Sequence, residues 1–133
     1  MVATNYRDLI AWTKAFELAL EIYRQTARFP SEEKYGLTAQ LRRAAVSIPS
    51  NIAEGEGRRS KAEFRHFPFI ALGSLRELET QILVSDSLGY LRPNESVKLM
   101  AMAAKVGRII NGLCRSLLMK RQPAAECLLP TAD

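Results

Sequence analysis

Apolar residues recur every three or four positions along four long stretches of the 133-residue chain, which is the period of an α-helix. The stretches predicted as helices cover about residues 6–28, 32–56, 60–88 and 94–121. In the first stretch, the predicted core stripe is Leu9, Trp12, Phe16, Ala19, Tyr23 and Thr26. In the last, it is Leu99, Ala103, Val106, Ile110, Leu113 and Leu117. Because no segment alternates apolar and polar residues over five or more positions, we expect no sheet.

Helix ends and breaks follow from a few polar residues and prolines. Asn5 is placed to cap the first helix, and Ser60 with Glu63 forms a capping box at the start of the third. Pro49 and Pro68 fall inside the second and third helices, where proline removes a backbone donor. We therefore expect a kink or a split at Pro49 and a local bend at Pro68.

Short connections around residues 30, 57 and 89 force successive helices to run antiparallel. The predicted fold is all-α, an up-down-up-down antiparallel four-helix bundle over residues 1–121. Residues 122–133 contain two prolines and no helical period, and we expect them to form a disordered C-terminal tail.

Composition and charge indicate the class of partner and the cellular compartment to expect. The chain has 19 Lys and Arg, 14 Asp and Glu and a net charge of +5, which favours a polyanionic partner such as nucleic acid. No run of about 18 uncharged apolar residues and no secretory signal is present, so we expect a cytoplasmic protein without a membrane-spanning helix. Two cysteines, Cys114 and Cys127, are too few for a disulfide framework.

Groups that could support catalysis are few. His66 is the only histidine and lies on the polar side of its helix. Glu54 and Glu56 are two residues apart at a helix end and point in different directions. The spacing of the two cysteines fits no zinc site. We therefore predict no catalytic residue, no metal site and no cofactor, and a hydrolase or nuclease using Glu54, Glu56 or His66 is only a third hypothesis.

Basic residues are concentrated in the fourth predicted helix, which has no acidic residue between positions 96 and 122. Its six cations are Lys98, Lys105, Arg108, Arg115, Lys120 and Arg121. The first five fall within an arc of about 140°, opposite the apolar stripe. A second cluster is Arg58, Arg59 and Lys61. We predict that Lys98, Lys105, Arg108, Arg115 and this second cluster bind nucleic acid through the phosphate backbone, without sequence reading.

Two other interpretations of these helices stay open. The cationic face is a solvated surface if its charges pair with Glu and Asp of neighbouring helices, and the third helix supplies such partners in Glu77, Glu79 and Asp86. Apolar residues beyond one stripe per helix also predict a self-association surface. These residues are Ile10, Leu18, Leu20 and Ile22 in the first helix and Val97, Met100, Ala101, Ala104 and Leu118 in the fourth.

Several runs of residues resemble one bacterial family. They include Tyr6-Arg7-Asp8-Leu9, the run RRAAVSIPSNIAEG from Arg42 to Gly55, ALGSLRELE from Ala71 to Glu79 and Leu88-Gly89-Tyr90. The chain resembles the four-helix bundle family of proteins encoded in intervening sequences of 23S ribosomal RNA genes. The resemblance implies a ring-like homopentamer and brings no catalytic residues. A related group, the accessory variability proteins of diversity-generating retroelements, forms basic pentamers associated with RNA, DNA and a reverse transcriptase. Pro68 departs from the family pattern.

Five residues of the Arg42–Gly55 run are predicted to be structural or to lie at an interface between subunits: Arg42, Arg43, Pro49, Asn51 and Glu54. Side chains of Ser47, Ser50 and Asn51 are placed to repair the hydrogen bonding that Pro49 disturbs. Glu54 is expected to pair with Arg42 or Arg43 of a neighbouring subunit, or with Arg58 of its own.

Two functions follow from these patterns. The first is a non-enzymatic, homo-oligomeric helical bundle that binds structured RNA or DNA through charge contacts to the backbone. The alternative is a protein–protein interaction or scaffold module without a nucleic-acid ligand. The expected partners are thus further copies of the chain, RNA or DNA, or another protein.

Overall fold

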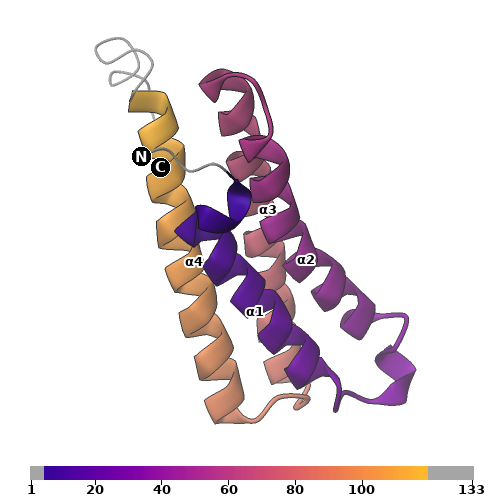
Figure 1. Cartoon of the computed structure of the whole chain (residues 1–133). Helices are drawn as coiled ribbons and strands as arrows, with labels where there is room; N and C mark the ends of the chain where they lie inside the picture. The colour runs from indigo at the N-terminus through magenta and orange to yellow at the C-terminus, as the bar shows by residue number, and fades with distance from the viewer. Residues whose placement is uncertain (1–4, 120–133) are drawn as a thin grey trace.

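The computed structural model describes residues 5–119, and every regular element in that range is helical. Figure 1 shows four long helices alongside one another, with successive helices alternating in direction. The elements are a 3-10 turn η1 (Tyr6–Asp8), α1 (Ile10–Thr26), a 3-10 turn η2 (Ser31–Glu33), α2 (Leu37–Glu56), α3 (Lys61–Ser87) and α4 (Pro93–Met119). The predicted four-helix bundle is confirmed for these residues, and the predicted tail over 122–133 lies outside them.

The first two helices begin later than predicted, because side chains bind backbone amides just before them. The Asn5 carboxamide oxygen accepts a 2.7 Å hydrogen bond from the Arg7 amide and caps η1 rather than α1. Leu9 is extended and separates η1 from α1. The Glu33 carboxylate accepts a 2.9 Å hydrogen bond from the Leu37 amide, so α2 begins at Leu37 rather than at residue 32. Local side-chain to backbone bonds of this kind compete with helix formation.

Neither internal proline splits its helix. Pro49 in α2 and Pro68 in α3 are both buried within helices that continue on either side. The Asn51 side chain donates to the Ser47 carbonyl oxygen (2.8 Å) and to the Ser47 hydroxyl (3.1 Å). The Ser47 and Ser74 hydroxyls are 2.9 Å apart and join α2 to α3. The predicted polar repair near Pro49 therefore involves Ser47 and Asn51, and of the two outcomes predicted there, a kink or a split, the split does not occur.

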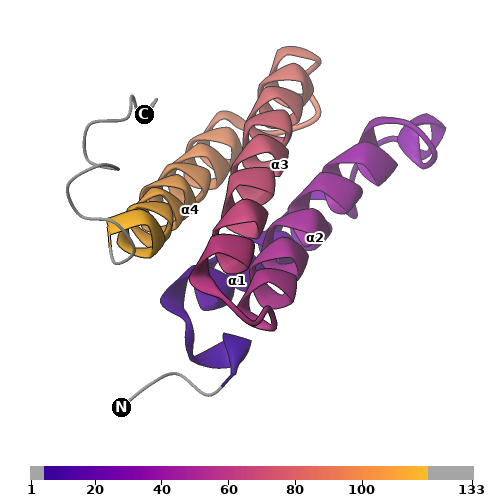
Figure 2. The same ribbon diagram turned by 90° about the horizontal axis from the view of Figure 1, so that it is seen from above.

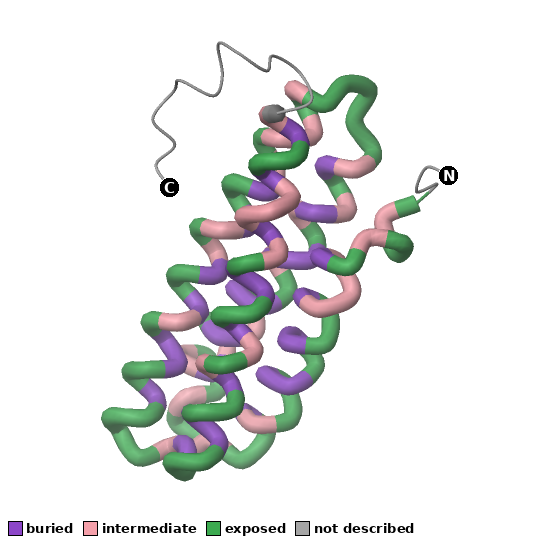
Figure 3. The backbone as a smooth tube through the Cα atoms, turned by 90° about the vertical axis from the view of Figure 1, so that its left-hand side faces the viewer, coloured by how far each residue is buried: buried purple, intermediate pink, exposed green. Residues whose placement is uncertain are grey.

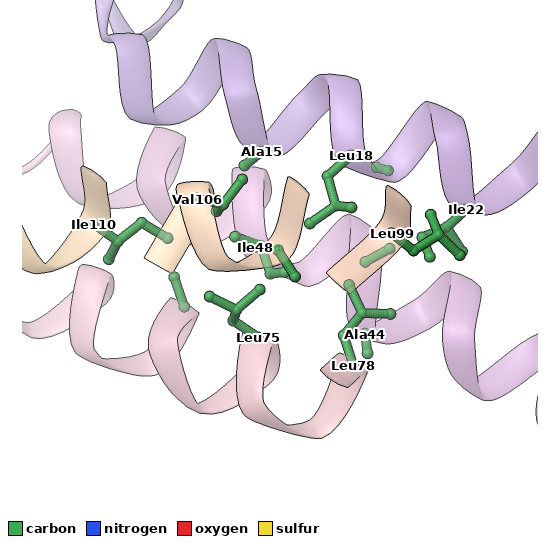
Figure 4. Packing of buried hydrophobic residues seen from close by; sticks show 14 of the residues in the cluster. Ala15, Leu18, Ile22, Ala44, Ile48, Leu75, Leu78, Leu99, Val106 and Ile110 are labelled. Atoms are coloured by element: carbon green, nitrogen blue, oxygen red, sulfur yellow. The ribbon is translucent and has the colours of Figure 1, made fainter. Parts of the chain in front are cut away.

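The core lies between all four helices, with each helix packing on two neighbours: α1 on α2 and α4, and α3 on α2 and α4. Figure 3 shows buried positions facing inward along each helix and exposed positions on the outside. Figure 4 shows Leu18, Ile48, Leu75 and Val106, one from each helix, meeting in the same cluster. Most of the predicted stripe on α4 is buried, so that register is confirmed.

The stripe predicted for α1 is confirmed only in part: Ala19 and Thr26 are buried and Leu9 and Trp12 pack against the core, but the centre of the inward face lies elsewhere. The inward face of α1 is formed by Ala11, Ala15, Leu18 and Ile22, which are all buried. Phe16 and Tyr23, both predicted in the core, are 42% and 43% exposed. Small alanines allow α1 to approach its neighbours closely, and the aromatic residues lie beside this face instead.

Seen from above in Figure 2, the α2–α3 turn and the C-terminal end of α4 lie at the same end of the bundle, as they also do in Figure 1. The turns that precede α2 and α4 lie at the other end. None of the helices between residues 5 and 119 combines the length and the hydropathy that crossing a membrane requires.

Candidate nucleic-acid interface

The outer surface of α4 carries four exposed cations: Lys98, Lys105, Arg108 and Arg115. Glu95, in the first turn, is the only acidic residue of this helix. The other two predicted cations, at positions 120 and 121, lie outside the described residues. The core stripe turns the remaining side of α4 inward, so the cations project away from the bundle.

Lys98 differs from the other three because it is already paired. Its ammonium nitrogen is 3.3 Å from a carboxylate oxygen of Glu21 on α1. Glu21 is 7% exposed. A hydrogen bond from Gln25 holds its pKa below the ordinary value, together with Arg24 and Lys98, while burial acts in the opposite direction. Lys98 therefore shares the Glu21 carboxylate with Arg24, and its charge is compensated only in part.

The register between the antiparallel helices α1 and α4 explains why Lys105 has a different environment. Lys105 lies two helical turns after Lys98 along α4, and Lys14 lies two turns before Glu21 along α1. Lys105 is therefore level with another cation, which itself pairs with Glu17 at 3.3 Å. Within residues 5–119, no acidic side chain forms an ion pair with Lys105, Arg108 or Arg115.

Of the pairing with neighbouring helices that the alternative interpretation expects, residues 5–119 show one case, Lys98 with Glu21 of α1, and none with the three acidic residues of α3 named there. Glu79 pairs with Arg76 of its own helix at 2.8 Å, and Glu77 accepts a hydrogen bond from Gln81. Asp86 accepts a 2.6 Å hydrogen bond from the Ser96 hydroxyl, a neutral donor on α4. The cationic side chains in the C-terminal two thirds of α4 are thus available to an external anion.

The second predicted cluster lies in and after the α2–α3 turn, at the end of the bundle where α4 finishes (Figure 1). Arg58 forms an ion pair with Glu54 at 3.0 Å, and its guanidinium lies over the Phe67 ring, 4.6 Å from the centroid. Arg59 and Lys61 are exposed. The structure thus brings Arg115 and this cluster to one end of the bundle, and places Lys98 toward the other.

The residues of the Arg42–Gly55 run have different roles. Arg42 donates a 2.9 Å hydrogen bond to the Thr26 hydroxyl, and its guanidinium lies 4.5 Å from the Tyr23 ring centroid, so it joins α1 to α2. Arg43 is exposed beside a hollow of about 160 Å³ between α2 and α3. Of the partners predicted for Glu54, the structure places Arg58 of the same chain against it.

The predicted self-association residues divide into two groups. Leu18 and Ile22 belong to the core, so their assignment to an outer surface is wrong. Ile10, Leu20, Val97, Ala101 and Ala104 are exposed, while Met100 and Leu118 are half-buried. Phe16 and Tyr23 of α1 were predicted in the core, so their exposure was not predicted from the sequence. The signal that could have indicated it is the second stripe, of alanines with Leu18 and Ile22, which also has helical spacing.

The described residues contain no group of three or more His, Cys, Asp or Glu side chains arranged to hold a metal ion. His66 is exposed at the start of α3. Cys114 is a buried free thiol, and burial raises its pKa to about 11, so it is a poor nucleophile at neutral pH. The chemistry that this surface offers is attraction of anions.

Comparisons with known proteins identify relatives of the fold and sequence. The family described as 23S rRNA-intervening sequence protein matches residues 7–112. The crystal structure of a protein with unknown function from the S23 ribosomal protein family of Bacteroides thetaiotaomicron is similar, with a TM-score of 0.72 and 20% identity. That match covers 80% of this chain and 99% of the other. None of the curated proteins matches the chain.

Proposed function

The chain belongs to the family of 23S rRNA-intervening sequence proteins, and we propose that it is a non-enzymatic, homo-oligomeric bundle that binds structured RNA or DNA. The observation that carries this proposal is the outer face of α4. Lys105, Arg108 and Arg115 are exposed there without an acidic partner in the described part of the chain.

The spacing of these cations suits a phosphate backbone. Residues 105 to 115 extend over about 15 Å of helix, at about 1.5 Å per residue. Duplex DNA carries about one negative charge per 1.7 Å of its axis, so three cations over this length meet several phosphates. Contacts to phosphates position a protein but read no sequence, so binding should depend on the shape of the nucleic acid and on salt.

Binding of a fluorescent RNA hairpin and a duplex DNA, measured by anisotropy across a salt series, tests this function. We expect the variant Lys105→Gln/Arg108→Gln to bind more weakly and to lower the salt slope by about two, because two phosphate contacts are lost. Arg7→Gln/Lys34→Gln, which also removes two positive charges, is a matched control, since both residues are exposed and lie outside the four long helices. Wild-type protein that binds neither probe at low salt would refute the function.

Self-association is supported by two exposed apolar surfaces on different helices. Phe16, Leu20 and Tyr23 share one face of α1, and Phe69 and Leu83 share the outer face of α3. Two different surfaces on one subunit suit head-to-tail contacts, which close into a ring when the rotation allows it. We propose the homopentamer that the family resemblance implies, in which several cationic α4 faces would act together.

The mass in solution tests the assembly. Five chains of 14.9 kDa give about 75 kDa by light scattering after size exclusion. We expect Phe16→Gln/Leu20→Gln to reduce this mass while the helical content is retained. Tyr35→Gln, at a position 87% exposed outside the helices, should leave the mass unchanged. A monomeric wild-type protein would contradict the proposal.

The second candidate, a protein-interaction or scaffold module, is favoured by the same exposed apolar side chains. Salt separates the two functions, because apolar docking does not weaken steeply with ionic strength whereas phosphate binding does. A partner that docks equally well on the Lys105→Gln/Arg108→Gln variant would favour the scaffold function.

A further inference from the structure

A cavity of about 420 Å³ opens beside the α2–α3 turn and is lined by Arg58, Glu63, His66 and Phe67. Arg58 comes from the turn, and the other three come from the first two turns of α3. The α2–α3 turn, beside which the cavity opens, lies at the end of the bundle where α4 finishes (Figure 1). Its volume is within the range of about 300–1,000 Å³ that is typical of small-ligand sites.

Planar groups with restricted orientation form much of this lining. The Arg58 guanidinium lies over the Phe67 ring, 4.6 Å from the centroid, and its Nη2 is held 3.0 Å from a Glu54 carboxylate oxygen. The His66 ring meets Phe67 edge to face, at 5.3 Å and 79°. A guanidinium stacked on an aromatic ring offers its second face to another flat group.

Polar groups around the planar lining differ in charge. The Glu63 carboxylate lines the cavity and is able to accept hydrogen bonds from a ligand, while Arg59 and Lys61, exposed in the adjoining segment, carry positive charge. A ligand that matches this lining is flat, carries N–H donors and is linked to negative groups. A nucleobase attached to a phosphate backbone has all three properties.

We propose that this cavity binds an unpaired base of single-stranded or looped nucleic acid. Arg58 stacks on the base, Glu63 accepts from its N–H groups, and Arg59 and Lys61 contact the flanking phosphates. The proposal rests on the proposed nucleic-acid function and adds a base contact to the backbone contacts of α4. An unpaired base is required because a base within a duplex cannot present its face.

The test compares a fluorescent single-stranded RNA with the same strand in a duplex. Arg58→Lys keeps the charge but removes the plane, and we expect it to bind the single strand about five- to tenfold more weakly while duplex binding changes less than twofold. Phe67→Leu, which keeps the bulk of the side chain, should have the same effect. Arg92→Lys, at an exposed position just before α4 at the opposite end of the bundle, is the matched control and should change neither affinity. Circular dichroism checks the folding of each variant.

His66 provides a local measurement, because it is the only histidine and its imidazole protons are readily assigned by NMR. The single strand should shift these resonances in wild-type protein, and in Arg58→Lys only at about five- to tenfold higher strand concentration. Unmoved His66 resonances at saturation, or unchanged single-strand affinity in Arg58→Lys, would overturn the proposal.

The outcomes also separate this proposal from the proposed function. If only Lys105→Gln/Arg108→Gln lowers affinity, the nucleic-acid function stands and the base site fails. If single-strand binding requires Arg58 but not the α4 cations, the base site stands and the α4 assignment fails. Wild-type protein that binds neither single strand nor duplex refutes both.

Discussion

Replacing Gly55 with alanine should destabilise the bundle, whereas the same replacement at Gly73 should stabilise it. Both glycines are helical, Gly55 in α2 and Gly73 in α3. A Cβ atom at Gly55 would lie 2.8 Å from Phe67 Cβ, 2.9 Å from Phe64 Cδ1 and 3.0 Å from the Phe64 carbonyl oxygen. A Cβ atom at Gly73 would meet nothing within 4 Å.

The magnitudes follow from two opposing effects. Alanine favours an exposed helix interior over glycine by about 0.8–1 kcal/mol, so Gly73→Ala should gain about that much. At Gly55 the gain in helix propensity is smaller, because α2 ends one residue later. Forcing extra atoms into a packed site there costs about 1–3 kcal/mol. A net loss of about 1–2 kcal/mol is expected there, and each kcal/mol corresponds to roughly 4 °C in the midpoint of thermal unfolding.

Equilibrium urea unfolding, followed by far-ultraviolet circular dichroism, measures both changes. All variants must be compared at one chain concentration, because the stability of an oligomer depends on it. If Gly55→Ala matched or exceeded the wild type in stability while Gly73→Ala gained the expected amount, the close approach of α2 to α3 would be wrong. The cavity beside Phe67 depends on that approach.

Three further changes test the polar contacts and the buried thiol. The pKa of Glu21 is lower in the folded state, so the unfolded state binds a proton at this carboxylate more readily. The urea midpoint of unfolding should therefore fall as the pH drops below about 4.5, and Glu21→Gln should weaken this pH dependence. Arg42→Lys should lower the free energy of unfolding by about 1 kcal/mol, because lysine keeps the charge but loses the planar contact with Tyr23; an unchanged urea midpoint would contradict this. In a Cys127→Ser background at pH 8, Cys114 should react with a disulfide reagent only after urea is added, since its pKa is about 11; rapid reaction of the folded protein would show that the thiol is accessible.

The later half of the fold follows most directly from the sequence. Ser60 accepts a hydrogen bond from the Glu63 amide at 3.2 Å, and α3 begins at the next residue, as the capping pattern predicts. The starts of α1 and α2 were not predicted, because Asn5 and Glu33 bind backbone amides in short turns. The side chains of Asn5 and Glu33 are suited equally well to capping the long helix and to stabilising a separate turn before it. The packing of the following helix decides which of the two structures forms.

The face of α1 could not be chosen from helical period alone. Trp12, Phe16 and Tyr23 form one periodic set, and Ala11, Ala15, Leu18 and Ile22 form another about a third of a turn away. Hydrophobicity favours the aromatic set, but the bundle buries the set with small residues because its neighbours then approach more closely. Trp12 and Phe16 stack on one another at 4.9 Å outside the centre of the core.

Which cations can bind a ligand is a property of the assembled bundle. Lys98 and Lys105 are equivalent in the sequence of α4, since they lie two turns apart on the same side. The register with α1 sets Glu21 against Lys98 and brings Lys14 level with Lys105, so Lys98 shares a carboxylate with Arg24 whereas Lys105 has no acidic partner among the described residues. The surroundings of Arg58 favour stacking over attraction of phosphate. Glu54 forms an ion pair with its charge, and the Phe67 ring holds its flat guanidinium in place. The two proposals, phosphate attraction along α4 and base stacking beside the α2–α3 turn, rest on different residues, so substitutions in α4 and at Arg58 can separate them.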